Sequence, residues 1–208
     1  SKRHVDQLLD EISELAPRRS RAGIRHALGL PPVMAIARNP KMLELAVAVL
    51  GHDAFPFRAT LFDKSPAANW LVVWHQDTAL PLRSRAEVPG WGPWSTKEGV
   101  AYAHAPEAAL SKVLAVRLHL DDSTVANGPL RVLPQTHMLG VLSDDQISEL
   151  ATRVPSQDCV VSRGGLIGMR PLLVHSSSKS HSEMSRRVLH IEYAASPGAA
   201  DPLELAQV

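Results

Sequence analysis

Apolar residues recur at helical spacing in two stretches near the start of the chain. The first stretch predicts an amphipathic helix over residues 3–15, which Pro17 ends. The second stretch follows Pro40 and carries a wide apolar stripe up to Gly51, so it predicts a second helix. We expect both helices to cover one face of a sheet, so that residues 1–52 form a mainly helical buttress.

After Phe55 the pattern changes to short apolar runs separated by Pro, Gly, Asn and Asp, which is typical of antiparallel sheets. One further helix is expected after Ser143, its N-cap, and it runs to about Arg153. The predicted strands are 57–62, 70–77, 113–120, 130–133, 158–162, 165–174 and 187–194. Many short strands beside a few helices predict a mostly β fold with flanking helices, a cupin-like jelly-roll barrel whose core covers residues 55–196.

Residues 81–106 interrupt this pattern. Prolines and glycines break every periodicity in the segment, yet it carries Trp91, Trp94 and Tyr102. A long, irregular loop with aromatic residues is more often a lid or a binding loop than a linker. We therefore predict a lid, with Arg83 and Trp94 closing over a bound small molecule. The alternative is a solvated arginine and a packed tryptophan.

The length and composition indicate one globular domain. The chain has 208 residues, of which 45% are apolar and 21% are charged, so a single domain over 1–208 is expected. The net charge of +1 gives no broad electrostatic reason to bind nucleic acid. The single cysteine, Cys159, excludes an internal disulfide and is expected in the core. No apolar run is long enough to cross a bilayer and the first residues lack a hydrophobic secretion segment, so a cytoplasmic protein without membrane contacts is expected.

A histidine and an aspartate two positions apart end one predicted strand. Alternation along the strand places His75 and Asp77 on the same face, so both side chains can reach one point. His175 comes at the end of the strand predicted over 165–174 and is the candidate third ligand. Two imidazoles and one carboxylate leave positions open on a metal, as non-haem iron(II) oxygenases require. Alone, the His-x-Asp tripeptide is common and indicates little.

Arg186 lies eleven positions after His175, at the start of the strand predicted over 187–194. An arginine there can hold the distal carboxylate of 2-oxoglutarate in a bidentate ion pair while the keto-acid end chelates iron. The alternative interpretation is a surface charge at a strand edge.

Contacts to a further substrate are suggested by parity on the strand predicted over 113–120. Arg117 and His119 share one face of it, and the aliphatic residues share the other. If the aliphatic face packs on the core, the polar pair points into the barrel mouth, where an arginine suits a substrate carboxylate or phosphate. A paired structural arginine explains Arg117 equally well. Lys64 is a further candidate. The remaining histidines carry no spacing signal and are expected to be exposed or structural: His4, His26, His52, His104, His137, His181 and His190. His190 has the same strand parity as Arg186 and could therefore face the interior.

Three separated motifs occur in one order along the chain. They are Trp74-His75-Gln76-Asp77, Asn127-Gly128-Pro129-Leu130-Arg131-Val132-Leu133-Pro134, and Arg170-Pro171-Leu172-Leu173-Val174-His175 with Arg186-Arg187-Val188. In this order and spacing they resemble the phytanoyl-CoA dioxygenase family of iron(II)/2-oxoglutarate-dependent oxygenases. Smaller bacterial members are similar over about residues 40 to 196.

The resemblance implies a double-stranded β-helix that binds Fe(II) through His75, Asp77 and His175, and 2-oxoglutarate through Arg186. It also implies O₂ as a cosubstrate, release of succinate and CO₂, and oxidation of a small molecule by hydrogen abstraction. Related halogenases lack the carboxylate ligand, so the presence of Asp77 favours hydroxylation. Desaturation, ring closure and epimerisation begin with the same hydrogen abstraction and stay open.

Two stretches depart from the family pattern. Pro134-Gln135-Thr136-His137 carries Gln135 where the family usually has a glycine, so a tight turn must be made with a side chain present. Ser176-Ser177-Ser178 replaces a glycine-containing stretch after the distal histidine. This replacement is expected to alter the channel wall.

Two other classes of protein share parts of this pattern. A cupin-like binding protein keeps the barrel and a metal without redox chemistry, but it has no use for Arg186 beside the metal. A zinc hydrolase also uses two histidines and a carboxylate. It needs a general base, however, and the sequence has no His-Glu-x-x-His helix to supply one. The sequence favours the oxygenase and indicates neither its substrate nor its oligomeric state.

Overall fold

The computed structural model describes residues 2–15 and 23–208, and the side chains of 5–12 and 23–208. The helices are α1 (Lys2–Leu15), α2 (Pro31–Ala37), α3 (Pro40–Leu50), α4 (Glu107–Leu110) and α5 (Asp144–Arg153). The strands are β1 (Gly23–Ile24), β2 (Phe55–Lys64), β3 (Val72–His75), β4 (Ala79–Leu82), β5 (Trp94–Lys97), β6 (Val100–His104), β7 (Val113–His119), β8 (Leu130–Val132), β9 (Gln157–Cys159), β10 (Leu166–Met169), β11 (His175–Ser177) and β12 (Arg186–Ala194).

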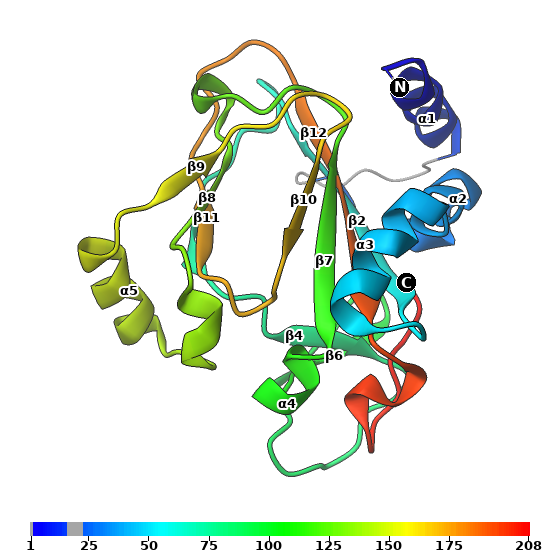
Figure 1. Ribbon diagram of the computed structural model, residues 1–208, viewed down its shortest axis with the longest axis vertical. Coiled ribbons are helices and arrows are strands. Elements are labelled where there is room, and N and C mark those ends of the chain that lie inside the picture. Colours follow the sequence, from blue (N-terminus) through cyan, green and yellow to red (C-terminus); the bar gives the residue numbers. More distant parts are fainter. Residues whose placement is uncertain (1, 16–22) are drawn as a thin grey trace.

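Two antiparallel sheets face each other across the molecule (Figure 1). The larger sheet has the strand order β1-β2-β12-β7-β10, and the smaller has the order β3-β11-β8-β9. A third sheet, β4-β6-β5, lies below them in Figure 1. Strands distant in the sequence are neighbours in both main sheets. This arrangement is a double-stranded β-helix, so the predicted mostly β, cupin-like fold is confirmed.

The N-terminal helices pack on the outer face of the larger sheet (Figure 1). Apolar side chains of α1 and α3 share one core cluster with outward residues of β7 and β12, so the prediction that these helices cover a sheet is confirmed. The members from these elements are Val5, Leu8, Leu9, Ile12, Met42, Ala46, Leu114, Val116, Leu189, Ile191 and Tyr193. The short helix α2 was not predicted, because its seven residues are too few to show a helical period.

The inner face of the larger sheet carries polar side chains. Arg117 alternates with Val116, which packs against the helices, so the predicted parity of β7 is confirmed. The strand register places Arg117 beside His190 of β12, and it places Arg186 of β12 beside Lys64 of β2. The Arg117–His190 pair and the Lys64–Arg186 pair therefore lie on the same wall of the barrel, four residues apart along β12.

The segment predicted as an irregular loop is irregular over residues 83–93 but contains β5 and β6, so that prediction was wrong for these two strands. These strands form a hairpin with Glu98 and Gly99 at its tip, where φ is 49° and 81°. Two consecutive positive φ values are the backbone form of a two-residue hairpin turn, whose usual sequence signal is Asn-Gly or Asp-Gly. The Glu-Gly pair lacks that signal. Trp91 and Tyr102 are buried in the core.

The prediction of a continuous strand over 165–174 was also wrong for residues 170–174. β10 ends at Met169, and the chain turns, with the Leu173 N–H donating to the Arg170 carbonyl over 3.1 Å. Pro171 has no N–H to donate, so a continuous ladder cannot pass through it. His175 consequently begins β11 in the opposite sheet. Similarly, the strand predicted over 70–77 is only Val72–His75, and the strand predicted over 158–162 ends at Cys159, which is half-buried.

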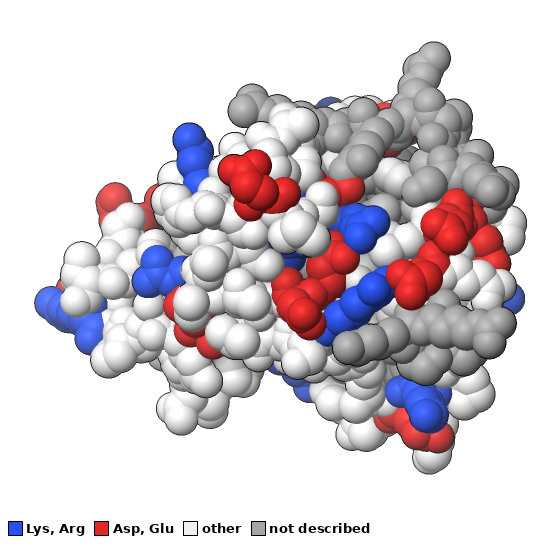
Figure 2. All heavy atoms as spheres, turned by 90° about the horizontal axis from the view of Figure 1, so that it is seen from above, with Lys and Arg blue, Asp and Glu red and all other residues white. Residues whose placement is uncertain are grey.

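Acidic and basic side chains are interspersed on the face that Figure 2 shows. Neither sign of charge dominates that face, in keeping with a net charge of +1. None of the helices in the described part of the chain has the length and apolar character that a membrane crossing requires.

Candidate metal centre

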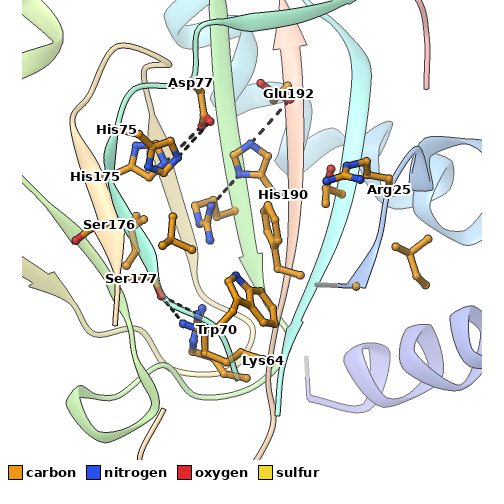
Figure 3. A pocket seen from close by; sticks show the side chains of 18 of the residues that line it. Arg25, Lys64, Trp70, His75, Asp77, His175, Ser176, Ser177, His190 and Glu192 are labelled. Atoms are coloured by element: carbon orange, nitrogen blue, oxygen red, sulfur yellow. Dashed lines mark hydrogen bonds and ion pairs between the residues drawn. The ribbon is translucent and has the colours of Figure 1, made fainter. Parts of the chain in front are cut away.

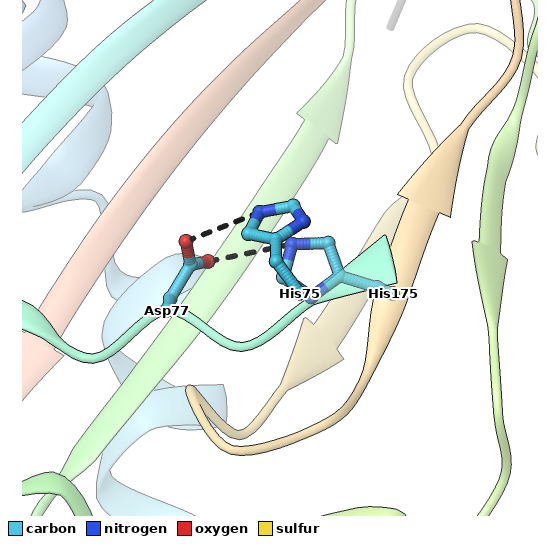
Figure 4. Close-up of side chains that lie close together, drawn as sticks. All are labelled: His75, Asp77 and His175. Atoms are coloured by element: carbon cyan, nitrogen blue, oxygen red, sulfur yellow. Dashed lines mark ion pairs between the residues drawn. The ribbon is translucent and has the colours of Figure 1, made fainter. Parts of the chain in front are cut away.

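Two histidines and one aspartate converge at the ends of two paired strands (Figure 4). His75 ends β3 and lies opposite His175, which begins β11. Asp77 lies two residues beyond β3, where its N–H donates to the Pro171 carbonyl over 2.9 Å. Its carboxylate oxygens are 3.7 Å from His75 Nε2 and 3.5 Å from His175 Nε2. One ligand atom from each side chain lies within 4.8 Å of the other two, which is a spacing that a single metal ion can bridge.

Backbone carbonyls fix the orientation of both imidazoles. His75 Nδ1 is 2.8 Å from the Val73 carbonyl, and His175 Nδ1 is 2.8 Å from the Leu173 carbonyl. Because a carbonyl only accepts hydrogen bonds, both Nδ1 atoms carry the proton and both Nε2 atoms present a lone pair. The two rings therefore aim the nitrogen that ligates metals toward Asp77.

The charge states also suit a metal. Burial raises the pKa of Asp77, but His175, His190, His75 and Arg58 outweigh it and lower the pKa to about 2. Burial lowers the pKa of His175. At neutral pH the group therefore offers an ionised carboxylate and an uncharged imidazole, which are the ligand forms that bind a divalent cation.

Two buried cations lie farther along the same interior. Arg186 is 4% exposed and Lys64 is 1% exposed. The Lys64 ammonium donates to Ser177 Oγ over 2.8 Å and to the Ser178 carbonyl, and Arg186 Nε donates to the Asn127 carbonyl over 3.1 Å. Arg186 Nη1 has no hydrogen-bond partner in the described structure. Neither cation forms an ion pair with a described carboxylate.

The cation pair stays charged near neutral pH. Burial lowers the pKa of Lys64 to about 8, with Arg186 adding to the effect. Burial and Arg117 lower the pKa of Arg186 to about 10. A buried charge without a partner is costly, so this pair predicts that an anion is bound here.

The triad and the cation pair line one cavity of about 290 Å³ (Figure 3). Ser176 and Ser177 of β11 lie between His175 and Lys64 in this view. The hydroxyl of Ser177 lies between the two cations, since it accepts from Lys64 and is 3.4 Å from Arg186 Nη2. The cavity thus has a chelating end, carried by the smaller sheet, and a cationic end, carried by the larger sheet.

A sequence model of the phytanoyl-CoA dioxygenase family matches residues 4–188. The chain belongs to the phytanoyl-CoA dioxygenase family. It is similar to L-proline trans-4-hydroxylase of Streptomyces griseoviridis, with 25% identity over 186 residues that cover 76% of this chain and 61% of the relative. The chain therefore spans less than two thirds of that relative.

Solved structures show the same fold. The apo form of the non-heme monooxygenase ThoJ has a TM-score of 0.69 and 19% identity, covering 100% of this chain and 77% of that chain. EctD from S. alaskensis with bound Fe has a TM-score of 0.68 and 19% identity, covering 99% of this chain and 69% of that chain. HygX from Streptomyces hygroscopicus, with nickel and 2-oxoglutarate bound, has a TM-score of 0.64 and 14% identity, covering 93% and 79%.

Only some of the residues that the sequence predicted to contact the substrate line the cavity. Arg117 lines the cavity, and Lys64 lies beside Arg186 at the cationic end. His119 is buried on the same side of β7, and neither ring nitrogen has a partner in the described structure. Arg83 is exposed and pairs with Glu204 over 3.0 Å, away from the cavity. Trp94 does not line the cavity either, and the guanidinium of Arg85 lies over its ring.

Both departures from the family pattern have a visible structural result. Gln135 adopts a φ of 67°, so the turn keeps a left-handed conformation although a side chain is present. Ser176 and Ser177 form part of the cavity wall, as expected from their place after His175.

Several cavity residues were missed by the sequence analysis. Arg58, Thr60 and Phe62 alternate along β2 on the face that also carries the predicted Lys64, so strand parity was a signal for them. Glu192 was also missed, and it accepts from Arg58 through both carboxylate oxygens. No local signal predicts that pair, because its members are 134 positions apart.

Gln76 connects three segments around the metal centre. Its side-chain amide donates to the Gly140 carbonyl over 2.9 Å and to the Leu172 carbonyl over 2.7 Å. Its oxygen accepts from the Leu142 N–H over 2.9 Å. Gln76 is buried and follows His75, so it ties β3 to the turn that precedes His175.

Gln76→Leu is expected to loosen the metal centre. It leaves buried polar groups unsatisfied, so the free energy of unfolding should fall by about 2 kcal/mol. Because substituting a residue that supports the ligands typically costs 10- to 100-fold in metal affinity, iron(II) binding should weaken by about 10-fold. Denaturant unfolding and metal titration measure the two effects. Gln157→Leu, on an exposed position of β9, is the control, and equal effects in both variants would contradict the role of Gln76.

Proposed function

We propose that this protein is an iron(II)- and 2-oxoglutarate-dependent dioxygenase that hydroxylates a small molecule and releases succinate and CO₂. One observation carries the proposal: a single cavity contains both a His-Asp-His triad and two buried cations without a carboxylate partner among the described residues. A metal ion alone would leave the cations unsatisfied. A keto acid with a second carboxylate uses both ends of the cavity.

Each residue then has a defined task. His75 and His175 would hold iron(II) through Nε2 and Asp77 through a carboxylate oxygen, which leaves positions open for a keto acid and O₂. Bound iron(II) with 2-oxoglutarate and O₂ supplies the oxidising power for hydrogen abstraction. Arg186 and Lys64 would hold the distal carboxylate of 2-oxoglutarate, with the Ser177 hydroxyl between them.

Hydroxylation is the outcome that the ligand set supports. Asp77 occupies a ligand position that would have to be vacant for a halide. The named similarity to a proline hydroxylase also supports this outcome.

A zinc hydrolase fits the cavity less well. It needs a carboxylate or another base next to the metal-bound water. Besides Asp77, the described carboxylate that lines the cavity is Glu192, and both of its oxygens accept from Arg58. A metal-binding protein without catalysis fits poorly too, because it leaves Arg186 and Lys64 without a purpose.

Turnover tests the proposed function. Purified protein with iron(II), ascorbate, O₂ and 2-oxoglutarate should release succinate when a suitable acceptor is supplied, at a rate on the order of 1 per second. The panel of acceptors comprises small acids, amino acids including L-proline, and natural-product intermediates, and mass spectrometry follows both succinate and the oxygenated product. Release of succinate should require both iron(II) and 2-oxoglutarate. Hydrolysis of an ester or amide panel by zinc-loaded protein, without succinate release, would contradict the proposal.

A further inference from the structure

Arg117 is a third buried cation in the cavity, and the proposed cosubstrate leaves it unassigned. It is 7% exposed and forms no ion pair with a described carboxylate. Its Nε atom has no hydrogen-bond partner in the part of the chain that the structure describes. The guanidinium lies over the ring of Phe62, with Cζ 5.5 Å from the ring centroid. Arg117 thus lines the cavity and has a donor without a partner among the described residues.

A chain of polar contacts holds Arg117 in place. Its Nη1 lies 3.0 Å from His190 Nδ1. Because a guanidinium only donates, His190 Nδ1 accepts and the ring proton is on Nε2, which lies 3.9 Å from Glu192. Glu192 in turn is paired with Arg58, whose Nη1 donates to the Ala79 carbonyl over 3.0 Å. Figure 3 shows the contact between His190 and Glu192, on the wall opposite the triad.

The position of Arg117 separates it from the cosubstrate clamp. Arg117 pairs in register with His190, whereas Lys64 pairs with Arg186, four residues earlier on β12. Four strand residues span roughly 13 Å. The register therefore places Arg117 and the Arg186–Lys64 pair at different levels of the same wall, although the charge of Arg117 is near enough to lower the pKa of Arg186.

The charges of the residues that line the cavity also leave Arg117 without an assigned anion. The basic side chains that line it are Arg25, Arg58, Lys64, Lys97, Arg117 and Arg186. Glu192 neutralises Arg58, and the proposed metal uses Asp77. The distal carboxylate of 2-oxoglutarate faces Lys64 and Arg186. Arg117 remains inside without an anion, and Arg25 and Lys97 remain nearer to solvent.

We propose that the primary substrate is a small carboxylic acid whose carboxylate binds Arg117, with His190 as the residue that positions the guanidinium. This inference rests on the proposed function, since it assigns the substrate class of the same site. One unpaired buried charge matches a monoanion. The cavity volume of about 290 Å³ must also hold 2-oxoglutarate, so the acid is small. Arg25 and Lys97 attract the anion on its way in.

Binding experiments with matched pairs test the substrate class. The protein is loaded with Ni²⁺, which does not turn over, and with 2-oxoglutarate. Small acids of four to eight carbons are then compared with their primary amides by calorimetry, with L-proline and L-prolinamide among the pairs. At least one acid should bind ten-fold or more tightly than its amide. Equal binding of acids and amides, preference for phosphate monoesters, or no binding of any acid would overturn the inference.

Substitutions locate the contact. Arg117→Gln should weaken binding of that acid about 30-fold, because hydrogen bonds to charged groups are the strong ones, and should change the dissociation constant of 2-oxoglutarate by less than about three-fold. Lys112→Gln removes an exposed charge just before the same strand and should change neither value. His190→Leu should weaken acid binding, and His190→Asn, which retains an acceptor, should restore much of it.

The outcomes separate this inference from the proposed function. If Ni²⁺-loaded parent protein binds no 2-oxoglutarate, the proposed function fails. If 2-oxoglutarate binds normally but Arg117→Gln leaves acid binding unchanged, this inference alone fails. A loss of 2-oxoglutarate affinity in Arg117→Gln as large as that in Arg186→Gln would assign Arg117 to the cosubstrate and would also overturn it. Circular dichroism and the more conservative Arg117→Lys exclude misfolding as the cause, since Lys keeps the charge but loses the planar fork.

Discussion

Asp77→Ala is expected to abolish succinate release and to weaken iron(II) binding by at least about 100-fold. Substituting a residue that only hydrogen-bonds to a metal ligand already lowers metal affinity by about 10- to 100-fold. The physical reason is the loss of the anionic ligand, which leaves two neutral imidazoles for a divalent cation. Metal titration by calorimetry and the succinate assay measure the two effects. The fold should persist, because Asp77 lies beyond the end of β3 and outside the core clusters.

Asp53→Ala is the matched control for this variant. Asp53 is exposed and lies in the turn before β2, so its loss should leave metal affinity and turnover unchanged. Retention of iron(II) affinity by Asp77→Ala within a factor of about three would contradict the assignment of Asp77 as a ligand.

Arg186→Gln is expected to raise the dissociation constant of 2-oxoglutarate about 100-fold, because it removes two charged hydrogen bonds from the distal carboxylate. The affinity for the metal should not change. Thermal stability should be equal or slightly higher, since the variant removes a buried charge that has no carboxylate partner among the described residues. Calorimetric titration of 2-oxoglutarate into the metal-loaded protein measures the effect.

The neighbouring Arg187 provides a control, because it has a carboxylate partner and lies outside the cavity lining. Arg187 donates to both carboxylate oxygens of Asp121, over 2.7 Å and 2.8 Å, and does not line the cavity. Arg187→Gln should lower the free energy of unfolding by about 1 kcal/mol, because the pair is bidentate but partly exposed to solvent. It should leave 2-oxoglutarate affinity unchanged. Equal affinity for 2-oxoglutarate in Arg186→Gln and the parent would refute the clamp.

Local patterns in the sequence predicted the elements whose period is long enough to read. The apolar stripe of α1 and α3 and the alternation along β7 required only residues close in sequence. The pairing of His75 with Asp77 also follows from local alternation, although Asp77 lies just beyond the strand. These features depend on backbone geometry that neighbouring residues determine.

Other parts of the fold depend on residues far apart in the sequence. His175 was placed at the end of β10, whereas the turn at Pro171 carries the chain to the opposite sheet, where His175 begins β11. Lys64 was predicted to contact the substrate, but its contact with Ser177, 113 positions away, places it beside the proposed cosubstrate. Such contacts follow from strand register across the barrel, which no local pattern indicates.

The most direct test of the central claim is an anaerobic titration of 2-oxoglutarate into the iron(II)-loaded protein, followed by visible absorption. If the triad holds iron(II) with open positions and the two cations receive the distal carboxylate, the weak charge-transfer band of a bidentate keto-acid chelate should appear and saturate at one equivalent. The band should be absent in Asp77→Ala and should need far more 2-oxoglutarate in Arg186→Gln. Absence of the band in the parent protein, together with tight retention of zinc, would contradict the account.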